Sequence, residues 1–283
     1  MSNQHNNFLE TSDSIIYFEV HGKATGTPIF ILNGGPGFAH TYLMPSAPIW
    51  KKLGKDRPVI FYDQRGTGQS TIKSSKGTCT LKDQMDDLDA LRDYLGYEQI
   101  TLLGHSWGGF LGMAYTARYP AQVKRLILVD SAAPCFGETI FLQKYIFPEI
   151  QERRQNLAFA VELGDKEAIR SDTIEKFSML FYSQEKKEAL VSEVGNTAYN
   201  YDVNKDLWAD LEKYDLTPEI KKFTQPTLVI TGRFDMNVAP LVAYRIHKLI
   251  AKSKFEVFEY SGHLPFFEEP ERFIQVIREF ISE

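Results

Sequence analysis

The sequence predicts an α/β protein with a mostly parallel sheet of eight strands, helices on both faces and one helical insertion. Short apolar runs alternate with stretches of helical periodicity along most of the chain, which is typical of a parallel sheet covered on both faces. Glycine-rich loops follow several of these runs. The alternation is interrupted once, over residues 134–222, where no buried-strand run occurs.

The strands are predicted where apolar and β-branched residues cluster. Leu81, Met85, Leu88, Leu91 and Leu95 recur at helical spacing with charges between them, which predicts an amphipathic helix. Residues 270–281 predict a closing helix. The strand runs are 14–20, 29–32, 59–62, 100–103 and 126–129, followed after the interruption by 227–230 and 255–258.

The interruption predicts a cap over a site at the carboxyl ends of the strands, where open α/β sheets bind their ligands. We expect several polar helices in it, at 141–163, 166–181, 186–197 and near 207–213. The predicted domains are therefore an α/β core made of residues 1–133 and 223–283, and a helical cap, or lid, made of residues 134–222.

Composition excludes several classes of protein. The chain has 283 residues, 43% of them apolar, which is enough for one large core. Its net charge is −5 and it has no basic stripe, so we expect no nucleic-acid partner. Cys79 and Cys135 lie far apart and lack metal-ligand spacing, so we expect two reduced thiols.

No targeting or membrane segment is expected. The first residues lack the charged and apolar regions of a signal peptide, and no apolar run approaches the roughly 20 residues of a membrane span. We therefore expect a cytoplasmic protein, with a small-molecule or short-peptide substrate as its partner. The sequence makes no prediction of oligomeric state.

The strongest motif is Gly104-His105-Ser106-Trp107-Gly108, a G-x-S-x-G pattern. An apolar run precedes it and helix-forming residues follow it, which is the strand–turn–helix context of a nucleophile elbow. Such a turn holds its serine at a strained backbone angle, so the residues within two positions must lack bulk. The pattern predicts Ser106 as a nucleophile.

A serine hydroxyl needs a base, and the base needs an orienting acid, which follow the serine in the order acid then histidine. Asp235 comes just after run 227–230, and His263 comes just after run 255–258. Both therefore lie where strand ends converge on Ser106. We predict Asp235 as the orienting acid, with Glu259 as a weaker rival, and His263 as the base.

Acyl transfer also needs donors aimed at the oxyanion. One should be the Trp107 amide, and the other should come from the glycine-rich loop 33–37, where Gly35 is favoured over Gly34. The loop 63–70 is predicted to be structural, with Arg65 held by charge-assisted bonds for which Asp63 is the candidate. No Walker motif, dinucleotide fingerprint or zinc spacing occurs, so no cofactor or metal is expected.

Together these residues resemble the α/β-hydrolase fold family over nearly the whole chain, and within it the proline iminopeptidase group. The matching motifs are G-G-P-G at 34–37, D-Q-R-G-x-G-x-S at 63–70 and G-x-S-W-G-G at 104–109. The resemblance implies a helical cap and a triad of Ser106, Asp235 and His263. It also implies release of an N-terminal proline as one activity.

Two departures bear on that activity. The group has His before G-G-P-G, whereas this chain has Asn33. The group also holds the substrate's free amine with cap glutamates, and residues 195–202 contain none; Glu193 and Asp202 are the candidate substitutes. A buried ammonium needs a buried acid beside it. A neutral or bulky ester is therefore a better substrate for this site than a peptide with a free N-terminal amine.

The leading hypothesis is therefore a serine hydrolase of carboxylic esters or lactones, a class that includes openers of macrocyclic lactones in this fold. The alternatives are a proline iminopeptidase and, more remotely, a ligand receptor with little turnover. Haloalkane and epoxide hydrolases are disfavoured because they use a carboxylate where this elbow has a serine. The candidate substrate-binding residues are Gly34, Phe38, Tyr145, Phe181, Tyr199 and Glu193.

Overall fold

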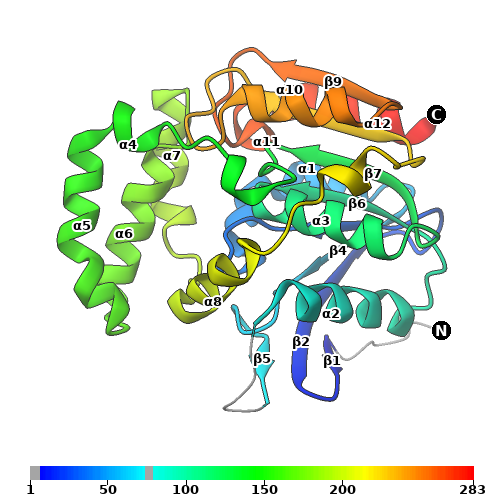
Figure 1. The fold of residues 1–283 in the computed structure, drawn as a ribbon, viewed down its shortest axis with the longest axis horizontal. Helices are drawn as coiled ribbons and strands as arrows, with labels where there is room; N and C mark the ends of the chain where they lie inside the picture. The colour runs from blue at the N-terminus through cyan, green and yellow to red at the C-terminus, as the bar shows by residue number, and fades with distance from the viewer. Residues whose placement is uncertain (1–6, 74–78) are drawn as a thin grey trace.

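The computed structural model describes residues 7–73 and 79–283. Their strands form one nine-stranded sheet in the order β1-β2-β4-β3-β6-β7-β8-β9, with β5 beside β2 (Figure 1). The strands are β1 (Phe8–Glu10), β2 (Ser14–Gly22), β3 (Ile29–Leu32), β4 (Pro58–Tyr62), β5 (Thr71–Ile72), β6 (Ile100–His105), β7 (Val123–Val129), β8 (Thr227–Gly232) and β9 (Ser253–Phe258).

The predicted parallel sheet is confirmed. From β4 through β3, β6, β7 and β8 to β9 every neighbouring pair is parallel, whereas β2 runs antiparallel to β1, β4 and β5. Eight strands were expected, and the continuous path has eight. The ninth, β5, has two residues, too few to carry any periodicity in the sequence.

The sheet has an apolar core on each face. Residues of β3 alternate between the two cores: Phe30 and Leu32 face one, and Ile29 and Ile31 face the other. Every residue of β3, β4 and β6 is buried, as the continuous apolar runs predict. The helices that cover the faces are α1 (Ala47–Leu53), α2 (Leu81–Tyr94), α3 (Trp107–Arg118), α10 (Pro240–Leu249), α11 (Pro265–Glu268) and α12 (Pro270–Ser282), with the 3₁₀ helices η1 (His40–Ser46) and η2 (Phe136–Glu138).

The α-helices between β7 and β8 are called the inserted helices here, and α4 to α7 among them stand clear of the sheet at the left of Figure 1. The predicted helix 141–163 is wrong in one respect, since it divides before Pro148. Proline forces the preceding residue out of the α region, and Phe147 has φ −128° and ψ 58°. The inserted helices are α4 (Gln143–Ile146), α5 (Pro148–Glu162), α6 (Lys166–Ser178), α7 (Gln184–Val194), α8 (Tyr201–Leu211) and α9 (Thr217–Ile220).

The helix predicted near 207–213 begins earlier, as α8. The Asn200 side-chain oxygen accepts from the amides of Asp202 and Val203 at 3.0 and 3.2 Å. This is an N-cap, which satisfies amides that have no partner within the helix. The capping signal was present in the sequence at Asn200, one residue before the helix.

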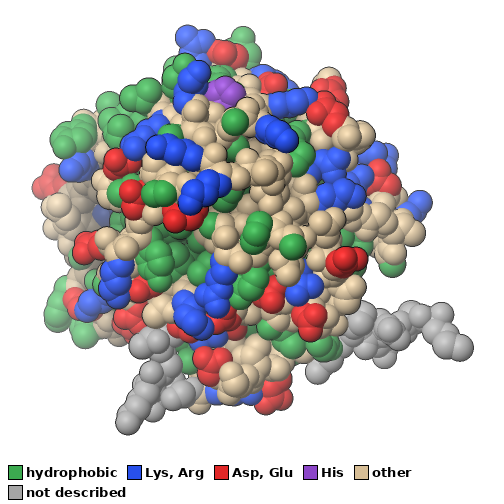
Figure 2. Space-filling model, turned by 45° about the vertical axis from the view of Figure 1, so that its right-hand side comes forward, with side chains coloured by type: hydrophobic (Ala, Val, Ile, Leu, Met, Phe, Trp, Pro, Cys, Tyr) green, Lys and Arg blue, Asp and Glu red, His purple; other side chains and the backbone are tan. Residues whose placement is uncertain are grey.

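The surface carries charges of both signs. On the face drawn in Figure 2, basic and acidic side chains are interspersed among hydrophobic and uncharged ones. Within the described part of the chain, every helix is too short or too polar to cross a lipid bilayer.

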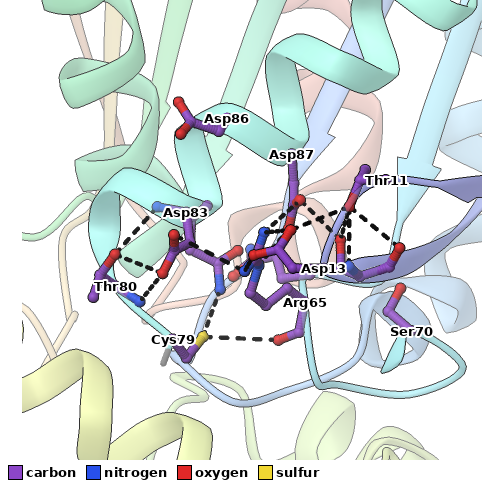
Figure 3. Close-up of polar contacts among 12 residues, drawn as sticks. Thr11, Asp13, Arg65, Ser70, Cys79, Thr80, Asp83, Asp86 and Asp87 are labelled. Atoms are coloured by element: carbon purple, nitrogen blue, oxygen red, sulfur yellow. Dashed lines mark hydrogen bonds and ion pairs between the residues drawn. The ribbon is translucent and has the colours of Figure 1, made fainter. Parts of the chain in front are cut away.

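Arg65 fixes the loop after β4, but through other partners than the predicted one. It is 2% exposed and donates two bonds to Asp87 on α2, at 2.7 and 2.8 Å, and two to Asp13, at 2.9 and 3.4 Å (Figure 3). Asp63 is therefore not its partner. The guanidinium forms a bidentate pair with the Asp87 carboxylate. Because Asp87 lies on a helix outside the loop, the spacing of residues within the loop does not reveal this contact.

The two residues before Arg65 fix two other loops. Asp63 accepts from the backbone amide of His40 at 3.0 Å, and the two side chains lie 2.7 Å apart. Gln64 donates to the Asn33 carbonyl at 2.9 Å and accepts from the Trp107 indole at 2.8 Å. Each side chain of Asp-Gln-Arg therefore holds a different neighbouring segment, which explains why the motif is structural.

We expect Arg65→Met to lower the free energy of unfolding by about 3 kcal/mol or more, because it leaves the Asp87 carboxylate buried without its cation. Urea unfolding followed by circular dichroism measures this. Arg153→Met is the matched control: its pair with Glu175 is half-exposed, so its loss should cost about 1 kcal/mol or less. Equal losses in the two variants would contradict the structural role of Arg65.

Candidate active site

Ser106 lies at the sharp turn between β6 and α3. Its backbone has φ 57° and ψ −120°, a strained region for a residue with a side chain. The flanking glycines are required by space: a Cβ at Gly104 would lie 2.3 Å from the Gly108 carbonyl oxygen, and one at Gly108 would lie 2.0 Å from that of Leu32. The elbow therefore packs its backbone directly against itself and against β3.

The structure brings Asp235, His263 and Ser106 together. Asp235 follows β8 and His263 follows β9, and His263 Nδ1 lies 2.6 Å from Asp235 Oδ2. Two backbone amides, of Asn237 and Val238, also donate to Asp235 Oδ1. The His263 ring and Ser106 border the same cavity of about 80 Å³. The roles of nucleophile, base and orienting acid stay predictions for these three residues.

Asn237 is a residue that sequence reasoning missed. Its Nδ2 lies 2.9 Å from His263 Nε2. Because Nδ1 donates to Asp235, Nε2 carries the lone pair and accepts from the Asn237 amide. The basic nitrogen of His263, Nε2, therefore already accepts a hydrogen bond, which comes from Asn237. The only sequence signal was the position of Asn237, two residues after Asp235.

Burial governs the electrostatics of the pair. It lowers the pKa of His263 to about 4, with the nearby Asp130 acting in the opposite direction. It also raises the pKa of Asp235, against the two backbone amides that favour the carboxylate. The imidazole is therefore neutral at pH 7, which is the form that accepts a proton.

The backbone amides around Ser106 include two candidate oxyanion donors. The Gly34 amide donates to the Tyr42 hydroxyl at 2.6 Å, so it is occupied. Gly35 borders both the small cavity and a larger one. Trp107 is the first residue of α3, where an amide has no partner within the helix. Because the Gly34 amide is occupied, Gly35 stays the predicted donor from this loop, with Trp107 as the other.

His105 connects these loops. The Gly34 amide donates to Tyr42 Oη, which donates to His105 Nδ1 at 2.7 Å, and His105 Nε2 donates to the His263 carbonyl at 2.9 Å. Burial lowers the pKa of His105 well below its usual value, so the ring is neutral and each nitrogen has one role. This relay joins the Gly34 loop, the elbow and the His263 loop.

Asp130, at the end of β7, was also missed. It is buried, has φ 46°, and accepts from the Gly232 amide at 2.8 Å. Burial and the Asp235 charge raise its pKa well above the usual value. The sequence signal was an acid directly after a buried strand, at the same sheet edge as Ser106.

His105, Asp130 and His263 have ligand atoms within 4.8 Å of one another. All four ring nitrogens of the two histidines already take part in hydrogen bonds with protein groups. This cluster is therefore better described as a hydrogen-bonded support for the site than as a metal centre. The expectation of no metal stays a prediction.

A cavity of about 730 Å³ opens beside Ser106 under the inserted helices. Of the predicted substrate-binding residues, Gly34 borders the small cavity, Tyr199 the large one and Phe38 both. The described lining of the large cavity is mostly apolar and aromatic, with a few charged groups. Its aromatic members are Phe38, Trp107, Phe136, Phe141, Phe159, Tyr199, Tyr201 and Trp208.

Three predicted pocket residues lie elsewhere. Tyr145 on α4 is 70% exposed, Phe181 stacks on Phe267, and Glu193 is exposed on α7. None of the three borders either cavity. The expected lining is corrected at these positions, because the sequence does not show which side of an inserted segment faces the core.

The inserted segment is hydrogen-bonded to the Gly34–Gly37 loop. The Asn204 side chain donates to the Pro36 carbonyl at 2.7 Å, and the Asn200 amide donates to the Gly37 carbonyl at 2.9 Å. Phe38 and Tyr199 form an isolated β-bridge. The inserted segment thus fixes the Gly34–Gly37 loop, which carries the candidate oxyanion donor Gly35.

A second attachment joins the insertion to the His263 loop. Glu268 accepts from the amides of Tyr182 and Ser183 with one oxygen and from the Gly262 amide with the other, at 2.7–2.9 Å. The His263 amide donates to the Leu180 carbonyl at 2.8 Å. The site is therefore bounded by two hydrogen-bonded junctions.

Comparisons with known proteins agree with this architecture. A family model described as alpha/beta hydrolase fold matches residues 27–270. A proline iminopeptidase of Heyndrickxia coagulans is 33% identical, over 97% of this chain and 98% of that protein, and one of Clostridium botulinum is 31% identical over 94% of each. A thermophilic esterase of Thermogutta terrifontis superposes with a TM-score of 0.71 at 26% identity, covering 95% and 93% of the chains.

We expect Tyr42→Phe to lower the free energy of unfolding by about 1–3 kcal/mol, because it leaves the Gly34 amide and His105 Nδ1 buried without a partner. Thermal or urea unfolding measures it. Tyr17→Phe makes the same change at a partly exposed hydroxyl bonded to Glu19, and should cost about 1 kcal/mol or less. A Tyr42→Phe protein as stable as Tyr17→Phe would show that the relay adds nothing to stability.

Proposed function

This chain belongs to the α/β-hydrolase fold family, and from that premise we propose that it is a serine hydrolase of carboxylic esters or lactones. The observation that carries the proposal is the composition of the small cavity. Ser106, His263 and Gly35 border it, and no carboxylate of the described residues does. Such a cavity suits an uncharged scissile carbonyl and offers no counter-charge to an ammonium.

In the proposed first half-reaction, Ser106 Oγ attacks the carbonyl carbon while His263 Nε2 takes its proton. The oxyanion that forms accepts from the Trp107 and Gly35 amides. Collapse breaks the carbon–oxygen bond, and Nε2 returns the proton to the leaving alkoxide. The products of this step are the free alcohol and an ester of Ser106; in a lactone the alcohol remains attached to the acyl group.

In the second half-reaction, Nε2 takes a proton from water as the water oxygen attacks the acyl-enzyme. The proton then passes to Ser106 Oγ as the carboxylic acid leaves. Asp235 holds His263 in the tautomer that leaves Nε2 basic throughout. Because the Asn237 amide occupies Nε2 before substrate binds, we infer that this amide moves aside when Ser106 transfers its proton.

The inserted segment 134–222 is proposed to act as the cap, or lid, of this enzyme, with residues 1–133 and 223–283 as its core domain. It supplies most of the wall of the large cavity, including Arg154, Lys176 and Tyr199. The cap therefore selects the substrate while the core performs the chemistry.

Release of N-terminal proline is the second candidate, favoured by the curated relatives at about 30% identity. This activity requires an acid near the free amine of the substrate, and that is the requirement that the site meets least well. Glu193 and Asp202 are exposed and border neither cavity. Asp172 and Glu162 border the large cavity, but neither borders the small cavity that contains Ser106, and the Asp172 carboxylate is engaged by Arg154 at 2.7 Å.

Ser106→Ala tests the proposed nucleophile. We expect hydrolysis of 4-nitrophenyl esters to fall by about 10⁴-fold or more, as for loss of a triad serine in other enzymes. Far-UV circular dichroism verifies the fold of the variant. Full activity of Ser106→Ala would overturn the assignment.

A substrate panel separates the candidates. We expect turnover of a neutral ester and a lactone to exceed that of L-proline 4-nitroanilide. Rapid turnover of the anilide that is lost when its amine is acetylated would favour the iminopeptidase. Failure of every substrate to exceed the Ser106→Ala rate would favour the ligand-receptor hypothesis.

The pH dependence has a defined sign. His263 must be neutral to accept the proton, so activity rises with pH through its pKa. Since burial lowers that pKa, we expect the acidic limb of kcat/KM below pH 6, under the ordinary histidine value of about 6.5. An acidic limb above pH 6.5, with the protein folded throughout by circular dichroism, would contradict this.

A further inference from the structure

We propose that Lys176 anchors an anionic group of the substrate beside Ser106. The inference rests on the proposed function and narrows its substrates to esters or lactones that carry a carboxylate or a similar oxyanion. Lys176 borders both the large cavity and the small one that contains Ser106 and His263. It is the one Lys, Arg, Asp or Glu residue among the described lining of the small cavity.

The aliphatic and aromatic surroundings hold the ammonium in place. Lys176 Nζ lies 4.4 Å from the ring centre of Tyr199 and 5.0 Å from that of Phe38. These rings attract a cation through their faces, but they accept no strong hydrogen bond. The side chain is 23% exposed and borders both cavities.

Its neighbouring charges compensate Lys176 only in part. Asp172 Oδ2 lies 3.7 Å from Nζ, longer than a hydrogen bond, while Asp172 Oδ1 accepts from Arg154 at 2.7 Å. One carboxylate therefore serves two cations. Glu162 borders the large cavity but not the small one. The charge that faces Ser106 is positive.

The ammonium also remains charged under ordinary conditions. Burial lowers the pKa of Lys176 to about 8, with Arg154 acting in the same direction and Asp172 opposing both. At pH 7 most molecules thus carry the cation. A bound carboxylate would supply a closer acceptor than Asp172, whose carboxylate also accepts from Arg154.

A second polar group in the large cavity fits the same class of substrate. Gln143, on α4, is 8% exposed and borders this cavity, and its Nε2 has no hydrogen-bond partner among the described groups. A buried donor without a partner costs stability. An oxygen-rich substrate, with its anion at Lys176 and a further carbonyl or hydroxyl at Gln143, would satisfy both donors.

The same cation opposes an N-terminal proline. A substrate ammonium in the small cavity would meet Lys176 with no carboxylate of the described lining beside it. Like charges at close range in a site of low dielectric repel strongly. Lys176 therefore acts on specificity in two ways, by attracting anions and by excluding amines.

The test compares esters matched in size and different in charge. 4-Nitrophenyl hydrogen adipate carries its charge on the acyl side and is compared with neutral 4-nitrophenyl hexanoate. 4-Acetoxybenzoate carries its charge on the leaving group and is compared with neutral 4-methylphenyl acetate. For wild type we expect higher kcat/KM for the anion of at least one pair. Lys176→Met should reduce that preference, the ratio of kcat/KM for the charged ester to that for the neutral one, about tenfold or more, mainly through the KM of the charged ester.

Three variants make the comparison specific. Lys176→Arg keeps the charge and should retain most of the preference, and Lys176→Gln gives a second neutral side chain if Met packs poorly. Lys166→Met removes an exposed lysine from the same helix and should leave the preference unchanged. Equal effects of Lys176→Met on the charged and neutral esters, or none on either, would overturn the proposal.

Binding separates this inference from the proposed function. Calorimetric titration of the Ser106→Ala protein with 4-nitrophenyl hydrogen adipate should give affinity that Lys176→Met weakens about tenfold. If this holds while no ester is turned over by wild type, the anion site stands and the hydrolase proposal fails. If esters are turned over but the anion binds no better than the hexanoate, the anion site fails alone.

Discussion

The relay from Gly34 through Tyr42 and His105 to the His263 carbonyl is the constraint on which the rest of the site depends. Three loops leave the sheet at the ends of β3, β6 and β9; β3 and β6 are paired directly, whereas β7 and β8 separate β6 from β9. A neutral histidine with one donor and one acceptor links these loops at defined distances, because each of its bonds has a preferred length and direction. The small cavity is the space that this spacing leaves.

Around the relay, buried polar side chains connect the remaining loops. Gln64 joins the Asn33 loop to the Trp107 indole, and Glu268 joins two inserted residues to Gly262. Buried polar groups are stable only when they are paired, so each of these links also excludes alternative loop positions. The site is held by many satisfied groups at the sheet edge rather than by apolar packing alone.

The sequence predicted what depends on local pattern. Runs of buried residues gave the strands, and the positions just after them placed Ser106, Asp235 and His263 at one edge of the sheet. Their roles remain predictions. Prediction from the sequence failed where a contact joins distant segments. Arg65 donates to Asp87 rather than to Asp63, and Phe181 stacks on Phe267 and does not border the cavity. Helical periodicity is too weak in polar inserted helices to show which side is buried, and the wrong pocket residues, Tyr145 and Glu193, come from that region.

The two junctions of the inserted segment have an evolutionary consequence. Asn200 and Asn204 hold the Pro36–Gly37 backbone, and the 180–183 segment holds the His263 loop through Glu268. A transplanted insertion from a relative would therefore disturb both loops unless it brought matching capping and amide contacts with it. Side chains on α5 and α6 border the large cavity and take no part in either junction, so substitutions there change the cavity wall without touching the two loops.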